Sequence, residues 1–96
     1  MVRVIATNYI KSEHIGAAEP LFREMLTATQ KEKGCIEYRL FTRKDEPGRY
    51  VFVEEWETQE DLDNHIASEH FKRIIPQTDK LKSKDGELII MTDEFR

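Results

Sequence analysis

The amino-acid sequence predicts an α+β fold of the ferredoxin-like order β-α-β-β-α-β, with an antiparallel four-stranded sheet that carries its helices on one face. Apolar and polar residues alternate in four separate segments, as in half-buried strands, and other segments repeat apolar residues at helical spacing. A chain of 96 residues without a linker or low-complexity segment is also the size of one domain, which we take to span residues 1–96.

The first strand is predicted over residues 2–10, which are rich in β-branched residues and are followed by a polar segment. Because side chains alternate across a strand, Val4 and Asn8 share one face while Ile5 and Tyr9 share the other. Asn8 therefore lies among apolar neighbours, where an amide needs a partner.

The first helix is indicated by an apolar stripe at helical spacing after the first strand. Proline fits the first turn of a helix but disrupts its interior, so Pro20 places the start of the regular helix near Ala17. We expect this helix to continue to about Lys33 and to be capped by Gly34.

A β-hairpin is predicted next. Residues 35–43 alternate as a second strand, residues 45–48 have the Asp-Glu-Pro-Gly composition of a tight turn, and residues 49–57 alternate as a third strand. The short connection means that these two strands pair with each other.

The last part of the chain is predicted to hold a helix in two pieces and a final strand. A capping box opens a helix over residues 58–66, Ser68 caps a second helix, and Pro76 interrupts that helix. Gly86 then restarts the chain as a strand over residues 87–92.

Helices on one face leave the other face of the sheet without cover in a single chain. That face carries the apolar side chains of Ile5, Tyr9, Phe41, Val51 and Val53. A second copy of the sheet would remove them from water, so the sequence predicts a homodimer.

The charge and cysteine content exclude several classes of function. The chain has 15 basic and 19 acidic residues, a net charge of -4 and no run of more than two Lys or Arg, so we expect no binding to nucleic acid or membranes. The single cysteine, Cys35, cannot form an intramolecular disulfide. Without a signal-peptide layout or an apolar span, the sequence favours a cytoplasmic protein.

The candidate site residues are the polar and aromatic side chains that this topology brings to the helix-covered face. They are Asn8, Tyr38, Glu54 and Trp56 on strands, and His65 and His70 on the two-piece helix. A carboxylate there must be paired or have a raised pKa, which favours a role for Glu54, whereas Trp56 alone is more typical of a core aromatic. The spacing of the two histidines does not place them on one face of a continuous helix, and we predict no metal site.

Three stretches of the sequence, taken together, are characteristic of a single protein family. They are Gly34-Cys35-Ile36-Glu37-Tyr38, Val53-Glu54-Glu55-Trp56 and His65-Ile66-Ala67-Ser68-Glu69-His70-Phe71. In order and spacing they resemble the antibiotic biosynthesis monooxygenase family, most closely its small quinol-monooxygenase-like members, and the resemblance covers nearly the whole chain.

The resemblance implies a dimeric α+β barrel with a pocket between sheet and helices. Similar members oxidise electron-rich phenols or hydroquinones with O₂ and use no metal, flavin or haem, so the expected partners are a small quinol-like aromatic substrate, O₂ and a second copy of the chain, and no cofactor is expected. The catalytic residues expected from it are His70 or His65 as the base, and Trp56 and Asn8 to orient the ring. The substrate-binding residues expected from it are Tyr38, Phe52, Glu54, Phe71 and Ile75.

Other relatives leave alternatives open. Some process small polar carbonyl compounds, so an isomerase is one alternative, and a non-catalytic small-molecule-binding stress domain is another. Haem-degrading relatives carry a histidine one turn beyond the position of Phe71, but this chain has Arg73-Ile74-Ile75 there. Haem degradation is therefore less favoured.

Overall fold

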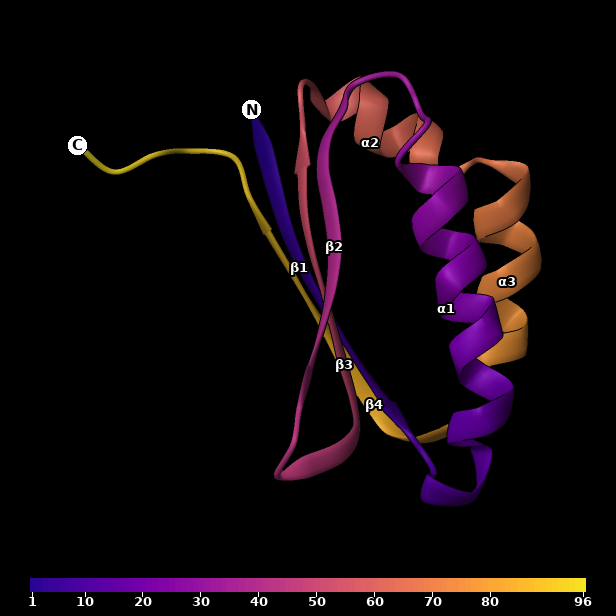
Figure 1. Ribbon diagram of the computed structural model, residues 1–96. Coiled ribbons are helices and arrows are strands. Elements are labelled where there is room, and N and C mark those ends of the chain that lie inside the picture. Colours follow the sequence, from indigo (N-terminus) through magenta and orange to yellow (C-terminus); the bar gives the residue numbers. More distant parts are fainter.

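The computed structural model describes residues 1–96 and has two layers, a sheet and a set of helices that covers one of its faces (Figure 1). The strands are β1 (Val2–Ile10), β2 (Cys35–Arg43), β3 (Glu46–Trp56) and β4 (Lys82–Met91), and the helices are α1 (Ile15–Thr29), α2 (Gln59–Ile66) and α3 (Glu69–Asp79), with a short 3₁₀ turn η1 (Ser12–His14) before α1. The sheet is antiparallel with the order β2-β3-β1-β4. The predicted ferredoxin-like fold is confirmed, including a second helix in two pieces.

The pairing of the strands lines up side chains that face the helices. Val4 of β1 pairs with Glu54 of β3 on one side and with Ile90 of β4 on the other. Glu54 in turn pairs with Tyr38 of β2. Because residues directly opposite each other share a face of the sheet, these four side chains form one row beneath the helices.

The hydrophobic core lies between this face of the sheet and the helices. Its buried apolar residues are Val2, Val4, Ile10, Ala18, Phe22, Met25, Tyr38, Tyr50, Phe52, Trp56, Leu62 and Ile74. The ring of Phe22 on α1 lies 4.9 Å from that of Tyr50 and 5.5 Å from that of Phe52, measured between centroids. These contacts fix α1 over the face that carries the candidate site residues.

The predicted bounds of the first helix are wrong at both ends. α1 begins at Ile15, and Pro20 lies inside it rather than in its first turn. Buried residues on both sides of Pro20 hold the helix against the core, and this packing outweighs the one backbone hydrogen bond that proline cannot make. The helix ends at Thr29 rather than Lys33, because the residues that follow form turns with hydrogen bonds to the third residue before them.

Gly34 does not cap α1 but directly precedes β2, which begins at Cys35. Its φ angle of 81° is in the left-handed region, and an added Cβ would overlap the carboxylate of Asp61. Asp61 cannot easily move, because its carboxylate accepts a hydrogen bond from the Thr58 hydroxyl at 2.9 Å and its N–H donates to that same hydroxyl at 3.1 Å. Thr58 and Asp61 form the predicted cap of α2, which is confirmed. The same cap explains why residue 34 is a glycine, because it holds Asp61 where a Cβ would lie.

We expect Gly34→Ala to lower the free energy of unfolding by about 3 kcal/mol, because it combines an unfavourable φ with overlap against a buried side chain. The matched control is Gly16→Ala on α1, where nothing lies within 4 Å of the added Cβ and helix propensity favours alanine by about 0.5 kcal/mol. Urea denaturation of both variants measures the two effects. Equal stability of the two variants would contradict this explanation of Gly34.

The turn of the hairpin comes earlier in the chain than predicted. Residues 44–45 form it, and β3 begins at Glu46, so Pro47 and Gly48 belong to the strand. The φ angle of Gly48 is 90°, and its missing side chain leaves room for the backbone of Ile10. The pairing of β2 and β3 is irregular at this point, so the glycine bends a strand instead of closing a turn.

The final helix and strand also differ from the prediction. Ser68 caps α3 as predicted, with its hydroxyl accepting a hydrogen bond from the N–H of Phe71 at 3.3 Å. The helix nevertheless continues through Pro76 to Asp79, because residues on both sides of the proline are buried. β4 begins at Lys82, well before its predicted start, and pairs along almost the whole of β1.

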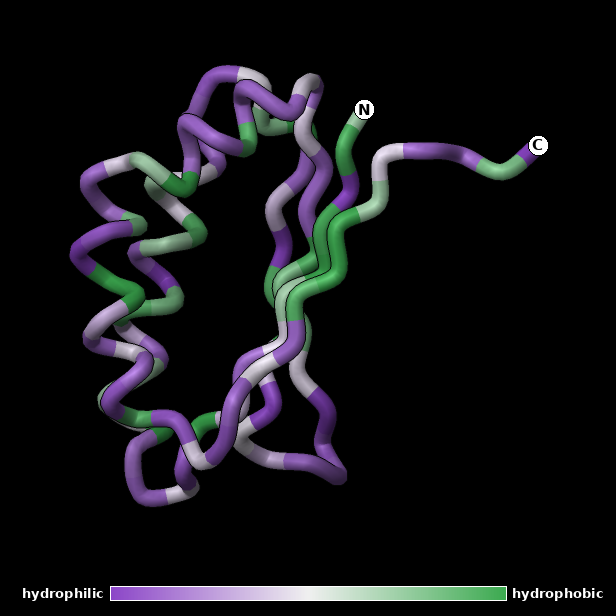
Figure 2. The backbone as a smooth tube through the Cα atoms, turned by 180° about the vertical axis from the view of Figure 1, so that it is seen from behind, coloured by the Kyte–Doolittle hydropathy of each residue, from purple (hydrophilic) through white to green (hydrophobic).

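Apolar side chains remain exposed along β4, which is one edge of the sheet. Leu88, Ile89, Ile90 and Met91 are 63%, 48%, 45% and 40% exposed. Figure 2 shows a continuous hydrophobic stretch on this strand, before the chain turns away to the C-terminus. Phe41, on the face turned away from the helices, is 50% exposed. None of the helices combines the length and the apolar composition that crossing a membrane requires.

Candidate functional site

A cavity of about 140 Å³ lies between the sheet and the helices. Of its 17 lining residues 13 are hydrophobic, and the four others are Asn8, Glu54, His65 and Thr78. An engineered apolar cavity of roughly 150 Å³ is large enough to bind benzene. The cavity therefore has the size and lining for one aromatic ring, with a few polar groups to orient it.

The rim of the cavity is apolar. Three of the lining residues, Ile66, Leu88 and Ile90, are 43%, 63% and 45% exposed, whereas most of the others are buried or half-buried. These three exposed residues come from the end of α2 and from the edge strand β4. Exposed apolar side chains beside the cavity favour an apolar or aromatic ligand over a highly charged one.

Seven of the nine residues predicted for the site line this cavity. They are Asn8, Tyr38, Phe52, Glu54, His65, Phe71 and Ile75. Trp56 and His70 are not among the lining residues. Each of the two contacts a residue that does line the cavity: Trp56 contacts Glu54, and His70 contacts His65.

Glu54 is a buried carboxyl group at the cavity. It is only 6% exposed, and its Oε1 accepts a hydrogen bond of 3.0 Å from the indole Nε1 of Trp56. Burial raises the pKa of Glu54 to about 7; the hydrogen bond from Trp56 opposes this rise, and the charge of Glu32 adds to it. Glu54 can therefore gain or lose a proton near neutral pH, and Trp56 holds it in place.

His65 reaches the cavity from α2. Its ring packs against Trp56, Phe71 and Tyr38, with centroids 4.8, 5.1 and 5.5 Å away. Its one side-chain hydrogen bond joins Nδ1 to Oε2 of Glu32 at 2.7 Å. Burial lowers the pKa of His65, and the interaction with Glu32 opposes that effect. A neutral imidazole in an apolar cavity is suited to accept a proton from a substrate.

Glu32 is the site residue that sequence reasoning missed. It lies in the turn between α1 and β2, and its Oε2 is also 3.0 Å from Nε2 of His70. The same nitrogen of His70 is 3.3 Å from the hydroxyls of Thr29 and Ser68. Because lysines flank Glu32 in the sequence, its segment is typical of a solvated loop. Glu32 is identified only in the folded chain, where α2 and α3 lie beside this turn and bring His65 and His70 to its carboxylate.

Glu32, His65 and His70 are also the residues best suited to hold a metal ion. One ligand atom of each lies within 4.8 Å of the others. The two ring nitrogens lie 2.7 and 3.0 Å from a single carboxylate oxygen, which are ordinary hydrogen-bond distances. The arrangement is that of a hydrogen-bonded cluster.

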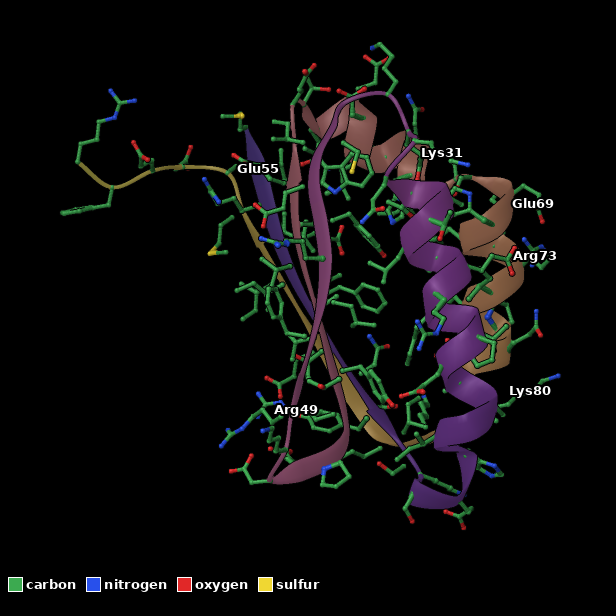
Figure 3. The ribbon with its side chains drawn as sticks, viewed as in Figure 1. Lys31, Arg49, Glu55, Glu69, Arg73 and Lys80 are labelled. Atoms are coloured by element: carbon green, nitrogen blue, oxygen red, sulfur yellow. The ribbon has the colours of Figure 1, made fainter.

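The turn of α3 beyond Phe71 carries Arg73, Ile74 and Ile75, the stretch in which the sequence has no histidine. Arg73 lies on the outer side of α3, where its guanidinium pairs with Glu24 of α1 and Glu69 of α3 (Figure 3). The next residue, Ile74, is completely buried, and Ile75 lines the cavity. This turn of α3 therefore offers the cavity aliphatic side chains and no imidazole.

Comparison with known families and solved structures agrees with the resemblance seen in the sequence. The family model described as antibiotic biosynthesis monooxygenase matches residues 1–77. A structure described as the crystal structure of antibiotic biosynthesis monooxygenase is 39% identical, with a TM-score of 0.94 over 98% of this chain and 99% of that chain. A conserved protein from Methanosarcina mazei Go1 is 33% identical, with a TM-score of 0.91 over 97% and 92% of the two chains.

Rv0793 from Mycobacterium tuberculosis is 26% identical, with a TM-score of 0.90 over 99% of this chain and 96% of that chain. Comparison with curated proteins gave no significant match. The match of the family model over most of the chain and the likeness to solved members lead to one conclusion. The chain belongs to the antibiotic biosynthesis monooxygenase family.

Proposed function

We propose that this protein is a monooxygenase that oxidises a one-ring, quinol-like aromatic compound with O₂ and without a bound cofactor. The observation that carries the proposal is the cavity, which has room for one ring, a mainly apolar lining and two groups that exchange protons, His65 and Glu54. A small and mainly polar cavity would have favoured the isomerase, and a cavity filled by side chains would have favoured a domain without catalysis. Membership of the family supports the same reaction class.

In this proposal His65 takes the proton of the phenolic hydroxyl at Nε2 and leaves a phenolate, which can give an electron to O₂. Asn8 and Tyr38 are the neighbouring groups able to donate hydrogen bonds to a developing oxygen anion. One atom of O₂ enters the ring and the other leaves as water, while the quinol is oxidised to a hydroxyquinone. The substrate supplies all the electrons, so the atoms balance without another reductant.

The test is oxygen uptake with 2-methylhydroquinone under ¹⁸O₂, with the product identified by mass spectrometry. We expect uptake that depends on the protein and one labelled oxygen atom in the quinone. Ala6→Leu adds bulk to a residue that lines the cavity and is expected to lower kcat/KM by about tenfold or more. Ala17→Leu makes the same change at an exposed position of α1 and should leave kcat/KM unchanged.

Two outcomes of this test would contradict the proposal. One is oxygen uptake that does not depend on the protein, and the other is an equal rate for Ala6→Leu and the native chain. Turnover of a small polar carbonyl compound, in the absence of any quinol oxidation, would instead assign the cavity to an isomerase that uses Glu54 and His65 to move a proton.

We also propose that the protein is a homodimer, joined through the sheet face that the helices leave bare. Phe41 and Ile89 lie on this face, 50% and 48% exposed. Sedimentation velocity is expected to give a dimer for the native chain, and the pair Phe41→Asp and Ile89→Asp should shift it to monomer, because the charges would be buried without partners. Ala17→Asp, on the helical side, should leave the dimer intact. A native monomer at micromolar concentration would rule the dimer out.

A further inference from the structure

We propose that Glu32 is a positioning residue that keeps the cavity-facing nitrogen of His65 free to accept a proton, and that His70, bound to the same carboxylate oxygen, tunes the proton affinity of His65. The inference deepens the proposed function and rests on it, since it assigns partners to the residue that takes the substrate proton.

The first step is the hydrogen-bond pattern. Oε2 of Glu32 is 2.7 Å from Nδ1 of His65 and 3.0 Å from Nε2 of His70. An ionised carboxylate only accepts hydrogen bonds, so both ring nitrogens must donate to it. Neutral His65 is then protonated at Nδ1 and carries its lone pair at Nε2. Because the ring lines the cavity and makes its only side-chain hydrogen bond at Nδ1, Nε2 is the nitrogen left for a substrate.

The second step is the charge that forms during the reaction. When the phenolic O–H bond breaks, its proton forms an N–H bond at Nε2 and His65 becomes a cation. That cation lies against the carboxylate of Glu32, which stabilises it without taking a proton itself. The side chain of Glu32 is 17% exposed and that of His65 only 3%, so water screens this attraction weakly.

The third step concerns His70. Its ring centroid is 6.0 Å from that of His65, and its side chain, 14% exposed, is nearer to water. A proton on His70 adds a like charge beside His65 and competes for the same carboxylate oxygen, which lowers the pKa of His65. His65 also faces Tyr38 of β2 and the cavity that holds Glu54 of β3. Neither of these makes a hydrogen bond to its ring.

The interruption of the helix between α2 and α3 makes this arrangement possible. Ser68 caps α3 and donates its hydroxyl hydrogen to the carbonyl of His65 at 2.6 Å. On a continuous helix, residues five apart point in directions about 140° apart. The turn at Ser68 removes that restriction, so both imidazoles reach the one carboxylate oxygen of Glu32.

The test is ¹⁵N NMR of the histidine side chains in the substrate-free protein. We expect neutral His65 of the native chain to carry its proton at Nδ1. Glu32→Gln keeps the shape but removes the charge, and should lower the pKa of His65 by about one pH unit. His70→Gln keeps a donor for Glu32 but cannot become a cation, and should raise the pKa of His65. The acidic limb of kcat/KM for 2-methylhydroquinone is expected to move in the same two directions.

A neutral His65 protonated at Nε2 in the native chain would overturn the inference, and this measurement needs no variant to fold. Shifts of the same sign in the two variants would also overturn it. So would stoichiometric binding of ZnCl₂ to the native chain that is lost in Glu32→Gln, because the cluster would then be a metal site. If the NMR result is as expected but the protein oxidises no quinol, the hydrogen-bond arrangement of Glu32, His65 and His70 stands and only the proposed function is refuted.

Discussion

Replacing His65 by Gln is expected to lower kcat/KM for 2-methylhydroquinone by about 100-fold or more, the usual contribution of a general base. The glutamine amide can still donate a hydrogen bond to Glu32, but it has no basic nitrogen for the cavity. His14→Gln is the matched control, because His14 is the residue before α1 and is not among the lining residues of the cavity. Oxygen uptake measures both variants, and circular dichroism confirms that they fold.

The pH dependence separates His65 from Glu54 as the base. The pKa of His65 is lowered from its ordinary value of 6.5, so activity that needs neutral His65 should fall only below that pH. A limb near pH 7 that persists in His65→Gln would assign the base to Glu54, whose pKa is about 7. A loss of less than about threefold in His65→Gln would remove His65 from the mechanism.

The alternation of residues along the strands predicted much of the site, because it decides which face of a sheet a side chain takes. Val4, Glu54 and Tyr38 come from three different strands, and the register places them in one row. Strand periodicity and family motifs were therefore enough to find seven of the residues that line the cavity. Periodicity predicts which face of the sheet a residue belongs to but not how far its side chain lies from a cavity. The sequence therefore predicts Trp56 and His70 as site residues, but not that they contact Glu54 and His65 without lining the cavity themselves.

Glu32 and the ends of the helices depend on contacts between distant parts of the chain. Glu32 is 33 residues from His65 and 38 from His70, and nothing in its own segment indicates a buried partner. Pro20 and Pro76 act locally as helix breakers, yet both lie inside helices because buried neighbours stabilise the helix on either side. Local rules fail where tertiary packing supplies the larger free energy.

Glu54→Gln is expected to change the pH dependence of stability by about 3 kcal/mol. Burial raises the pKa of Glu54 from 4.5 to about 7, and each pH unit of difference between the folded and unfolded chains is worth about 1.4 kcal/mol. Between these two values the folded chain binds a proton that the unfolded chain has lost. The native chain therefore loses stability as pH rises through this window. The Glu54→Gln variant has no carboxyl group at this position, so it does not show this loss of stability.

Urea denaturation at pH 4.5 and pH 8, at one fixed protein concentration, measures this difference. The amide of Gln adds a constant cost, if any, so the expected result is a gain for Glu54→Gln relative to the native chain that grows from pH 4.5 to pH 8. Glu55→Gln is the matched control, because Glu55 is also buried but pairs with Arg3 at 3.2 Å, and removing its charge should bring no such gain. A Glu54→Gln effect that is equal at both pH values would mean that Glu54 is ionised throughout, and it would then act in the cavity as a fixed negative charge rather than as a group that exchanges protons.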